Sequence, residues 1–376
     1  MQRLGIYIHI PFCRRKCFYC DFCSYPTLTP EIAVRYAERM RSDLESRAFD
    51  CADRTVDTVY FGGGTPTTMP TELLTGILKT VRQRYRPSPD AEITLECNPA
   101  TVTERDLASL REGGFNRISL GLQSTRENEL RALGRIHSFA DFCETFAAAR
   151  AAGFENISAD LMSGIPEQTP ESWLDSIERL CALRPEHISA YGLILEEGTP
   201  LYDRRDRLSL PDEECARRMY FEGIDALAAH GYAQYEISNF ARLGYESQHN
   251  LKYWNCDEYL GFGPSAYSDF GGDRFGNSRD LDAYLGGAEI ECERESVSRE
   301  GRINEYVMLR MRLCEGVVES AFQQRFGTSF CDRFAPQLAK YERMGLVRVT
   351  PNGAAFTPEG FYVSNAILSE LLDFSN

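Results

Sequence analysis

Short apolar runs rich in β-branched residues alternate with longer stretches of helical periodicity over roughly the first half of the chain. Such runs are typical of buried parallel strands. They predict strands at Ile6–Ile10, Thr58–Phe61, Glu92–Glu96, Arg117–Leu122, Asn156–Met162 and His187–Leu195. The amphipathic stretches between them predict helices at Glu31–Ala48, Glu72–Tyr85, Glu104–Glu112, Phe139–Ala152 and Pro170–Leu183. Thr103 and Asp106 form a capping-box pattern before the third helix, and Gly113 and Gly114 end it.

The alternation of six strands with helices predicts an α/β fold, in which helices cover a parallel sheet. A closed barrel of this kind needs eight strand–helix units. The pattern therefore favours an open, TIM-like partial (β/α)6 barrel, which we expect to occupy residues 1–210.

The alternation stops after Leu201. Glu213–His230 predicts one further helix, whereas Tyr232–Phe275 is aromatic, contains interspersed Gly and Asn, and predicts irregular backbone. We expect that stretch to form a ligand-facing or domain-joining surface, and we expect the polar segment Ser278–Arg302 to cross to another unit. Residues 211–300 are thus predicted to extend the barrel and to link it to the C-terminal unit.

Residues 301–376 predict a small α+β domain. Three apolar-periodic stretches (EYVMLRMRL, VESAFQQRF and FAPQLAKYERM) precede a hairpin that turns at Pro351-Asn352-Gly353, and a last helix comes after it. This order resembles a winged helix, a fold that often binds DNA. Residues 300–376 carry eight basic and nine acidic side chains without a basic stripe, which favours a structural or docking role.

Composition narrows the class of protein. The 376 residues carry a formal net charge of −15, which argues against a nucleic-acid partner. No signal segment begins the sequence, and no apolar run approaches the roughly 18 residues that a membrane span needs. We therefore expect a cytoplasmic protein, in which thiols stay reduced. Clustered cysteines then indicate a metal site or catalysis rather than disulfides.

Four of the thirteen cysteines lie within HIPFCRRKCFYCDFC, directly after the first predicted strand. Their spacing is Cys13-x3-Cys17-x2-Cys20-x2-Cys23. A zinc site usually uses two Cys pairs far apart in sequence, and a redox motif needs only two thiols. Several thiolates in one tight loop favour an iron–sulfur cluster, with zinc as the alternative.

A second group of candidate residues lies at the ends of the predicted strands. The loop GGGTPT at Gly62–Thr67 would allow a ligand to approach the backbone closely. Glu96, Gln123 and Asp160 lie at or near strand ends, on the edge where such folds place their sites. A satisfied internal ion pair is the alternative for each carboxylate, because a buried charge needs a partner.

Cys-x3-Cys-x2-Cys after the first strand resembles the radical SAM superfamily. The resemblance implies that Cys13, Cys17 and Cys20 bind three irons of a [4Fe–4S] cluster, and that the fourth iron binds S-adenosylmethionine (SAM). Cys23 would be a spare ligand when SAM is absent, part of a second ligand set, or a buried neighbour. The positions that match the family's SAM contacts are Tyr7, Gly63, Gly64, Thr65, Pro66, Glu96, Gln123, Arg135 and Asp160. The resemblance implies that Gly63-Gly64-Thr65-Pro66 holds the SAM amino group, Arg135 the carboxylate, and Asp160 or Gln123 the ribose.

YIHIPFCRRKCFYCDF, YFGGGTPT, SLGLQS, YEISNFA and the C-terminal unit are similar to the coproporphyrinogen III oxidase-like branch of that superfamily. This branch contains an oxygen-independent coproporphyrinogen III dehydrogenase and haem chaperones. The dehydrogenase pattern has Cys-x-Cys after the third position and a long arm before the cluster. Here two residues separate Cys20 from Cys23, and twelve residues precede Cys13.

HNLKYW at His249–Trp254 is similar to the haem-binding motif of the chaperones. The similarity implies that His249, Asn250, Tyr253 and Trp254 contact haem, since imidazole is a good axial ligand and aromatic rings pack on the macrocycle. Without that context, a His among aromatic residues would be interpreted as a packed residue.

Together these resemblances imply a chaperone that binds [4Fe–4S], SAM and haem as cargo, and delivers haem to haem-requiring proteins such as respiratory-chain enzymes. They also imply an electron donor for the cluster, and they raise homodimer formation and peripheral attachment to a membrane through partners. The dehydrogenase is the alternative. A radical SAM enzyme that modifies RNA is a remote second one, because it needs a basic surface.

Overall fold

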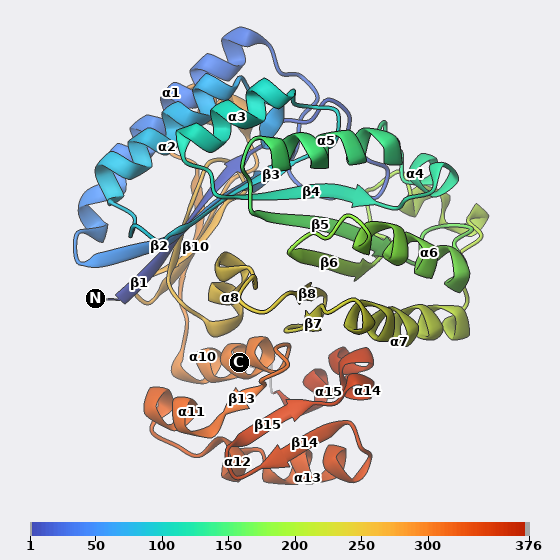
Figure 1. The fold of residues 1–376 in the computed structure, drawn as a ribbon. Helices are drawn as coiled ribbons and strands as arrows, with labels where there is room; N and C mark the ends of the chain where they lie inside the picture. Colours follow the sequence, from blue (N-terminus) through green and yellow to red (C-terminus); the bar gives the residue numbers. More distant parts are fainter. Residues whose placement is uncertain (1, 373–376) are drawn as a thin grey trace.

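The protein is described by a computed structural model that covers residues 2–372. Its main body is one open twelve-stranded sheet (Figure 1). The six predicted strands all form and pair in parallel, in sequence order. They are β1 (Gln2–Ile10), β2 (Arg54–Gly63), β3 (Glu92–Cys97), β4 (Arg117–Gln123), β5 (Asn156–Ser163) and β6 (His187–Gly192). The predicted open α/β fold is therefore confirmed, although β6 ends three residues earlier than predicted.

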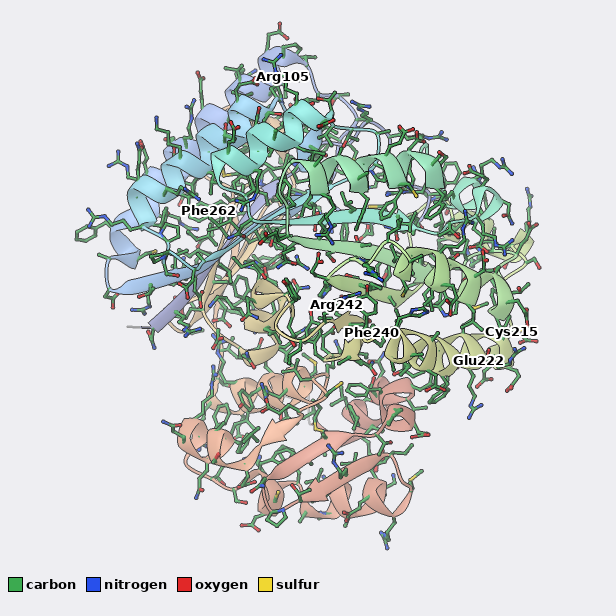
Figure 2. The ribbon with its side chains drawn as sticks, in the orientation of Figure 1. Arg105, Cys215, Glu222, Phe240, Arg242 and Phe262 are labelled. Carbon is green, nitrogen blue, oxygen red and sulfur yellow. The ribbon has the colours of Figure 1, made fainter. Side chains whose placement is uncertain are left out.

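Helices cover the outer face of this sheet, as Figure 1 shows for α1, α2, α3 and α5. Their bounds are α1 (Pro30–Arg47), α2 (Thr71–Tyr85), α3 (Glu104–Gly113), α5 (Phe139–Ala151) and α6 (Pro170–Cys181), and a short α4 (Glu127–Ala132) was not predicted. Thr103 and Asp106 form the predicted capping box at α3. Arg105 on this helix is exposed, whereas Phe262 packs on Tyr85 of α2 within the core (Figure 2).

Short strands extend the sheet at both edges. At one edge β8 (Asn239–Ala241) and β7 (Ala233–Gln234) lie next to β6, and at the other β9 (Tyr259–Phe262) pairs in parallel with β1. Next to β9 come β10 (Tyr267–Phe270), β11 (Asp273–Asn277) and β12 (Glu291–Ser296). The prediction of irregular backbone for Tyr232–Phe275 is therefore wrong, because strands of two to five residues are too short to give a periodic pattern.

The remaining helices of this part connect the sheet edges. They are the 3-10 turn η3 (Tyr202–Arg207) and the helices α7 (Glu213–Ala229), α8 (Gln248–Asn255) and α9 (Leu281–Leu285). The helix α7 confirms the prediction for Glu213–His230 within one residue.

The C-terminal part has a hydrophobic cluster of its own. It comprises α10 (Arg299–Arg310), β13 (Val317–Val318), α11 (Glu319–Phe326), α12 (Phe330–Arg333), α13 (Ala335–Arg343), β14 (Val347–Thr350), β15 (Gly353–Phe356), α14 (Pro358–Tyr362) and α15 (Ser364–Leu371). The predicted hairpin forms from β14 and β15, and β13 pairs with its inner strand. The winged-helix resemblance and the domain limits stay predictions.

The helix α8 joins the two parts, and lies between the sheet and the C-terminal part in Figure 1. At its first turn, the backbone N–H of His249 donates to Glu92 Oε1 of β3 at 3.1 Å. At its other end, Arg310 Nη1 donates to Asn255 Oδ1, and Arg325 donates to the carbonyl of Asn255 at 3.2 Å. Among residues 2–372, none of the helices combines the length and the hydropathy that a membrane span requires.

Candidate functional site

The cysteine-rich segment is a loop closed at its base by backbone hydrogen bonds. The N–H of Cys13 donates to the carbonyl of Tyr25 at 3.1 Å, and the N–H of Tyr25 donates to the carbonyl of Pro11 at 2.7 Å. These bonds pin the loop to the end of β1. The cysteines between Pro11 and Tyr25 are thereby presented at the carboxyl edge of the parallel strands, where such folds place their sites.

The middle of the loop is held from two further segments. The N–H of Phe18 donates to the carbonyl of Leu133 at 2.9 Å, and the N–H of Leu201 donates to the carbonyl of Phe18, also at 2.9 Å. The guanidinium groups of Arg15 and Arg204 lie over the ring of Phe18, with Cζ 5.3 Å and 5.1 Å from the ring centroid. These contacts hold the middle of the loop against the segments that contain Leu133 and Leu201.

A cavity of about 460 Å³ opens beside this loop, and Cys13, Cys17 and Cys20 all line it. Cys23 lies outside the cavity lining. Its side chain is buried, with Sγ 3.7 Å from Tyr25 Oη. The structure therefore brings three of the four thiols together and separates Cys23 from them.

The Gly-rich turn after β2 packs directly against the cysteine loop and lines the cavity next to it. Gly63 has φ +109°, and a Cβ on Gly64 would lie 2.6 Å from the carbonyl oxygen of Phe12. Both positions therefore require glycine for the turn to pack against the cysteine loop. Thr65 Oγ1 lies 3.4 Å from Cys13 Sγ. Pro66 is buried in the following 3-10 turn and does not line the cavity.

Of the four carboxylates that line this cavity, Glu96 and Asp160 come from the strands β3 and β5. Glu96 Oε1 accepts from the Tyr60 hydroxyl at 2.8 Å, and Glu96 Oε2 accepts from the Gly63 N–H at 3.1 Å. Burial raises the pKa of Glu96 to about 7, and burial also raises the pKa of Asp160, which accepts from Ser119 at 3.4 Å. Two half-buried carboxyl groups with raised pKa values favour a ligand that carries positive charge.

A cation and two amides complete the polar lining. Arg135 Nη1 lies 3.5 Å from Cys17 Sγ, and Arg135 Nη2 donates to Asn98 Oδ1 at 2.8 Å. Asn98 Nδ2 in turn donates to Thr65 Oγ1 at 2.7 Å, so that Asn98 connects the arginine to the Gly-rich turn. Gln123 has φ +72° and accepts from the Tyr191 hydroxyl at 2.8 Å.

Asn98 and Tyr191 were missed by the sequence reasoning, although both line the cavity. The signal for Asn98 was its place two residues after Glu96 in LECNP. Tyr191 lies in β6, where a polar ring at the carboxyl end of a parallel strand marks the same edge.

Tyr7 does not line the cavity. It lies in the interior of the barrel, with its hydroxyl 3.0 Å from His9 Nδ1 and its ring stacked on Tyr60 at 6.2 Å. Tyr7 is connected to the cavity indirectly, because it stacks on Tyr60, whose hydroxyl donates to Glu96. The predicted contact between Tyr7 and SAM stays a prediction.

His249 lies in the same interior, not at a surface. Its ring is 1% exposed, with Nδ1 2.8 Å from Thr58 Oγ1 and Nε2 2.9 Å from the Tyr253 hydroxyl. Burial lowers its pKa to about 3, so that the imidazole is neutral. Both ring nitrogens are thus engaged by hydroxyl groups. Asn250 and Trp254 are half-buried on the same helix.

The lining fits an iron–sulfur cluster better than a single metal ion. Among residues 2–372, no three His, Cys, Asp or Glu side chains converge closely enough to bind one ion. In a [4Fe–4S] cluster each thiolate binds a different iron, so three thiols spread around one cavity are suitable. Burial raises the pKa of Cys20 to about 11, and iron must displace its proton.

The comparisons with known proteins agree with this site. Residues 7–180 match the model of the radical SAM superfamily, and residues 297–363 match that of the HemN C-terminal domain. The chain is 34% identical over 376 residues to the haem chaperone HemW of Bacillus subtilis, covering 97% of this chain and 98% of that protein. It is 33% identical to the haem chaperone HemW of Escherichia coli, covering 98% of each.

A solved structure shares the whole fold. The structure of coproporphyrinogen III oxidase HemN from Escherichia coli, described as a radical SAM enzyme, superposes with a TM-score of 0.87. The two chains are 25% identical, and the match covers 99% of this chain and 91% of that one.

The open barrel, the thiol-lined cavity and the matching model define a radical SAM protein, a class whose members bind a [4Fe–4S] cluster and SAM. Within that superfamily, identity above 30% over nearly the full length of both chains shows that this chain belongs to the HemW family.

Proposed function

We propose that this protein is a haem chaperone, which binds haem and delivers it to haem-requiring proteins. The observation that carries the proposal is the full-length similarity to curated HemW proteins, which includes the barrel and the C-terminal part. The complete HNLKYW pattern on α8 supports it. We also propose respiratory-chain enzymes as acceptors, a separate electron donor, homodimer formation and a cytoplasmic location.

Cys13, Cys17 and Cys20 would hold the cluster, which supplies the electron that cleaves the sulfonium bond of SAM when both are bound. The Gly63 and Gly64 backbone would lie against the SAM methionine group. Of the two carboxylates, Glu96 is fixed by Tyr60 and the Gly63 amide, and is suited to bind a positively charged amino group.

Arg135 would bind the SAM carboxylate, because its guanidinium lies at the cavity wall beside Cys17 and is oriented by Asn98. Asp160 and Gln123 line the same cavity and would bind ribose hydroxyls. These assignments agree with the charges that the cavity presents.

The second candidate function is oxidative decarboxylation of coproporphyrinogen III. The similarity of fold to HemN favours it, since the same barrel and C-terminal part are present. Both functions need the cluster and SAM, so loss of either cofactor does not distinguish them.

A transfer experiment distinguishes the two functions. Anaerobically reconstituted protein is loaded with one equivalent of haem and mixed with a haem-free cytochrome, and the acceptor's absorbance is followed. A parallel sample receives coproporphyrinogen III, SAM and a reductant. Haem transfer without formation of protoporphyrinogen supports the chaperone. Tetrapyrrole turnover without haem transfer would support the dehydrogenase instead.

A further inference from the structure

The helix α8, which carries HNLKYW, is packed so closely against the sheet that a macrocycle has no space beside His249. The ring of His249 is 1% exposed, and its centroid lies 5.1 Å from that of the stacked Tyr60 ring. A Cβ added to Gly5 of β1 would lie only 3.3 Å from His249 Cε1 and 2.8 Å from Lys252 Cδ. For haem to bind His249, α8 must therefore first move away from the sheet.

The C-terminal part holds the last turn of α8. Arg325 of α11 donates to the carbonyl of Asn255 at 3.2 Å and to the carbonyl of Cys256 at 2.8 Å. Arg310 of α10 donates to the side chain of Asn255. Carbonyl groups at the end of a helix lack partners within the helix, and a positive charge is favourable there. These two arginines therefore oppose movement of this end of α8.

A second junction holds the first turn of α8 through Tyr235. The N–H of Cys314 donates to the carbonyl of Tyr235 at 3.0 Å, and the N–H of Ile237 donates to the carbonyl of Arg312 at 2.9 Å. The Tyr235 hydroxyl accepts from the N–H of Ser247, the N-cap residue of α8, at 3.3 Å. The junction gives a role to the YEISNFA segment, which contains Tyr235 and Ile237 and does not line the cavity.

Hydrogen bonds form much of the contact between the two parts. The barrel and the C-terminal part have separate hydrophobic clusters. From the barrel side, Tyr220, Ile237 and Cys256 pack against the C-terminal cluster, and all three are only partly buried. An interface of this kind between two cores can open while each core stays folded.

We propose that the C-terminal part is a gate for haem, which reaches His249 when Arg310 and Arg325 release the end of α8. This inference rests on the proposed function, because the cargo and the HNLKYW helix are the same. If only the open state binds haem, the apparent affinity is the intrinsic affinity multiplied by the fraction of open molecules. Contacts that keep the gate closed then weaken haem binding, so their removal should strengthen it.

The test measures the Kd of haem for the anaerobically reconstituted protein and for Arg325→Ala. Arg325 is exposed, so its replacement leaves the core intact. The Kd should fall roughly threefold to tenfold, the effect of two exposed charge-assisted hydrogen bonds. Arg333→Ala is the matched control, because Arg333 is also exposed and its ion pair with Glu300 lies within the C-terminal part. The control should bind haem with the Kd of the parent.

A second variant acts on the other arginine. Asn255→Ala removes the side-chain acceptor of Arg310 and leaves both arginines in place, and it should also lower the Kd of haem. SAM affinity and iron content should equal those of the parent in both variants, because Asn255, Arg310 and Arg325 do not line the cavity.

Hydrogen exchange measures opening without haem. Backbone amides of Gln248–Asn255 should exchange faster in Arg325→Ala and Asn255→Ala than in the parent, and Arg333→Ala should match the parent. In rapid mixing, the observed rate of haem binding should level off at high haem concentration, because opening precedes binding. The plateau should be higher in Arg325→Ala.

The outcomes separate the gate from the function. If the parent binds no haem, the proposed function fails. If the parent binds haem, and Arg325→Ala and Asn255→Ala bind it with an equal or higher Kd, the proposed function stands and the gate is wrong. Unchanged haem affinity in His249→Ala would also overturn the gate, because haem would then bind away from the helix that the gate holds.

Discussion

The guanidinium of Arg135 lies 3.5 Å from the sulfur of Cys17. This contact joins the group expected to bind the SAM carboxylate to a group expected to bind the cluster. Arg135 is held there by Asn98 and by the carbonyl of Gly121, not by the thiol alone.

Replacement of Arg135 by Ala should raise the Kd of SAM about tenfold to a hundredfold, the value of a lost charge-assisted hydrogen bond. Iron content should stay within error of the parent, because the three thiols are unchanged. Equilibrium binding of SAM to the reconstituted protein measures the effect. Arg14→Ala is the matched control, because Arg14 is exposed on the same loop and does not line the main cavity. Equal SAM affinity in Arg135→Ala and the parent would show that Arg135 is structural.

Replacement of Cys17 and replacement of Cys23 should differ in their effect on the cluster. Cys17→Ala removes a thiol that lines the cavity, and we expect the brown chromophore and most of the bound iron and sulfide to be lost. Cys23→Ala removes a thiol outside the cavity, and we expect a parent-like cluster. Iron and sulfide analysis after anaerobic reconstitution compares them. Equal losses in both variants would contradict the assignment of three ligands.

The raised pKa of Glu96 predicts a pH dependence in the ligand-free protein. The folded state keeps a proton to about pH 7, whereas the unfolded state loses it near pH 4.3. The folded state binds more protons than the unfolded state in that window. The contribution of Glu96 to the free energy of unfolding therefore falls as pH rises from about 4.3 to about 7. Urea titrations at several pH values should show a shallower fall for Glu96→Gln. An identical profile in the variant would exclude this carboxyl as the source.

SAM binding should follow the opposite trend. The ionised carboxylate of Glu96 is the form that binds a positively charged amino group, so SAM affinity should increase as pH rises through about 7. Glu96→Gln should bind SAM more weakly and lose most of this dependence. A parent whose SAM affinity is the same at pH 6 and pH 8 would contradict the role of Glu96.

Much of the fold was predictable because the six central strands are long, apolar and buried, which produces clear sequence patterns. The strands β7 to β11 were missed, because each has only two to five residues and gives no periodic pattern. The same limit applies to the six-residue helix α4.

The cavity lining was predictable where strand ends fix position. Glu96, Gln123 and Asp160 come together because parallel strands end at one edge of the sheet. Tyr7 and His249 could not be placed this way, because each side chain's direction depends on its neighbours. Tyr7 belongs to β1, which lies between β2 and β9, and His249 is turned inward by its bond to Thr58.

The most direct test of the chaperone function is a haem titration of the anaerobically reconstituted protein, followed by the haem absorbance band. We expect saturable binding near one haem per chain, and transfer of that haem to a haem-free acceptor when the two are mixed. Absorbance that rises linearly without saturation, with no transfer to the acceptor, would contradict the account.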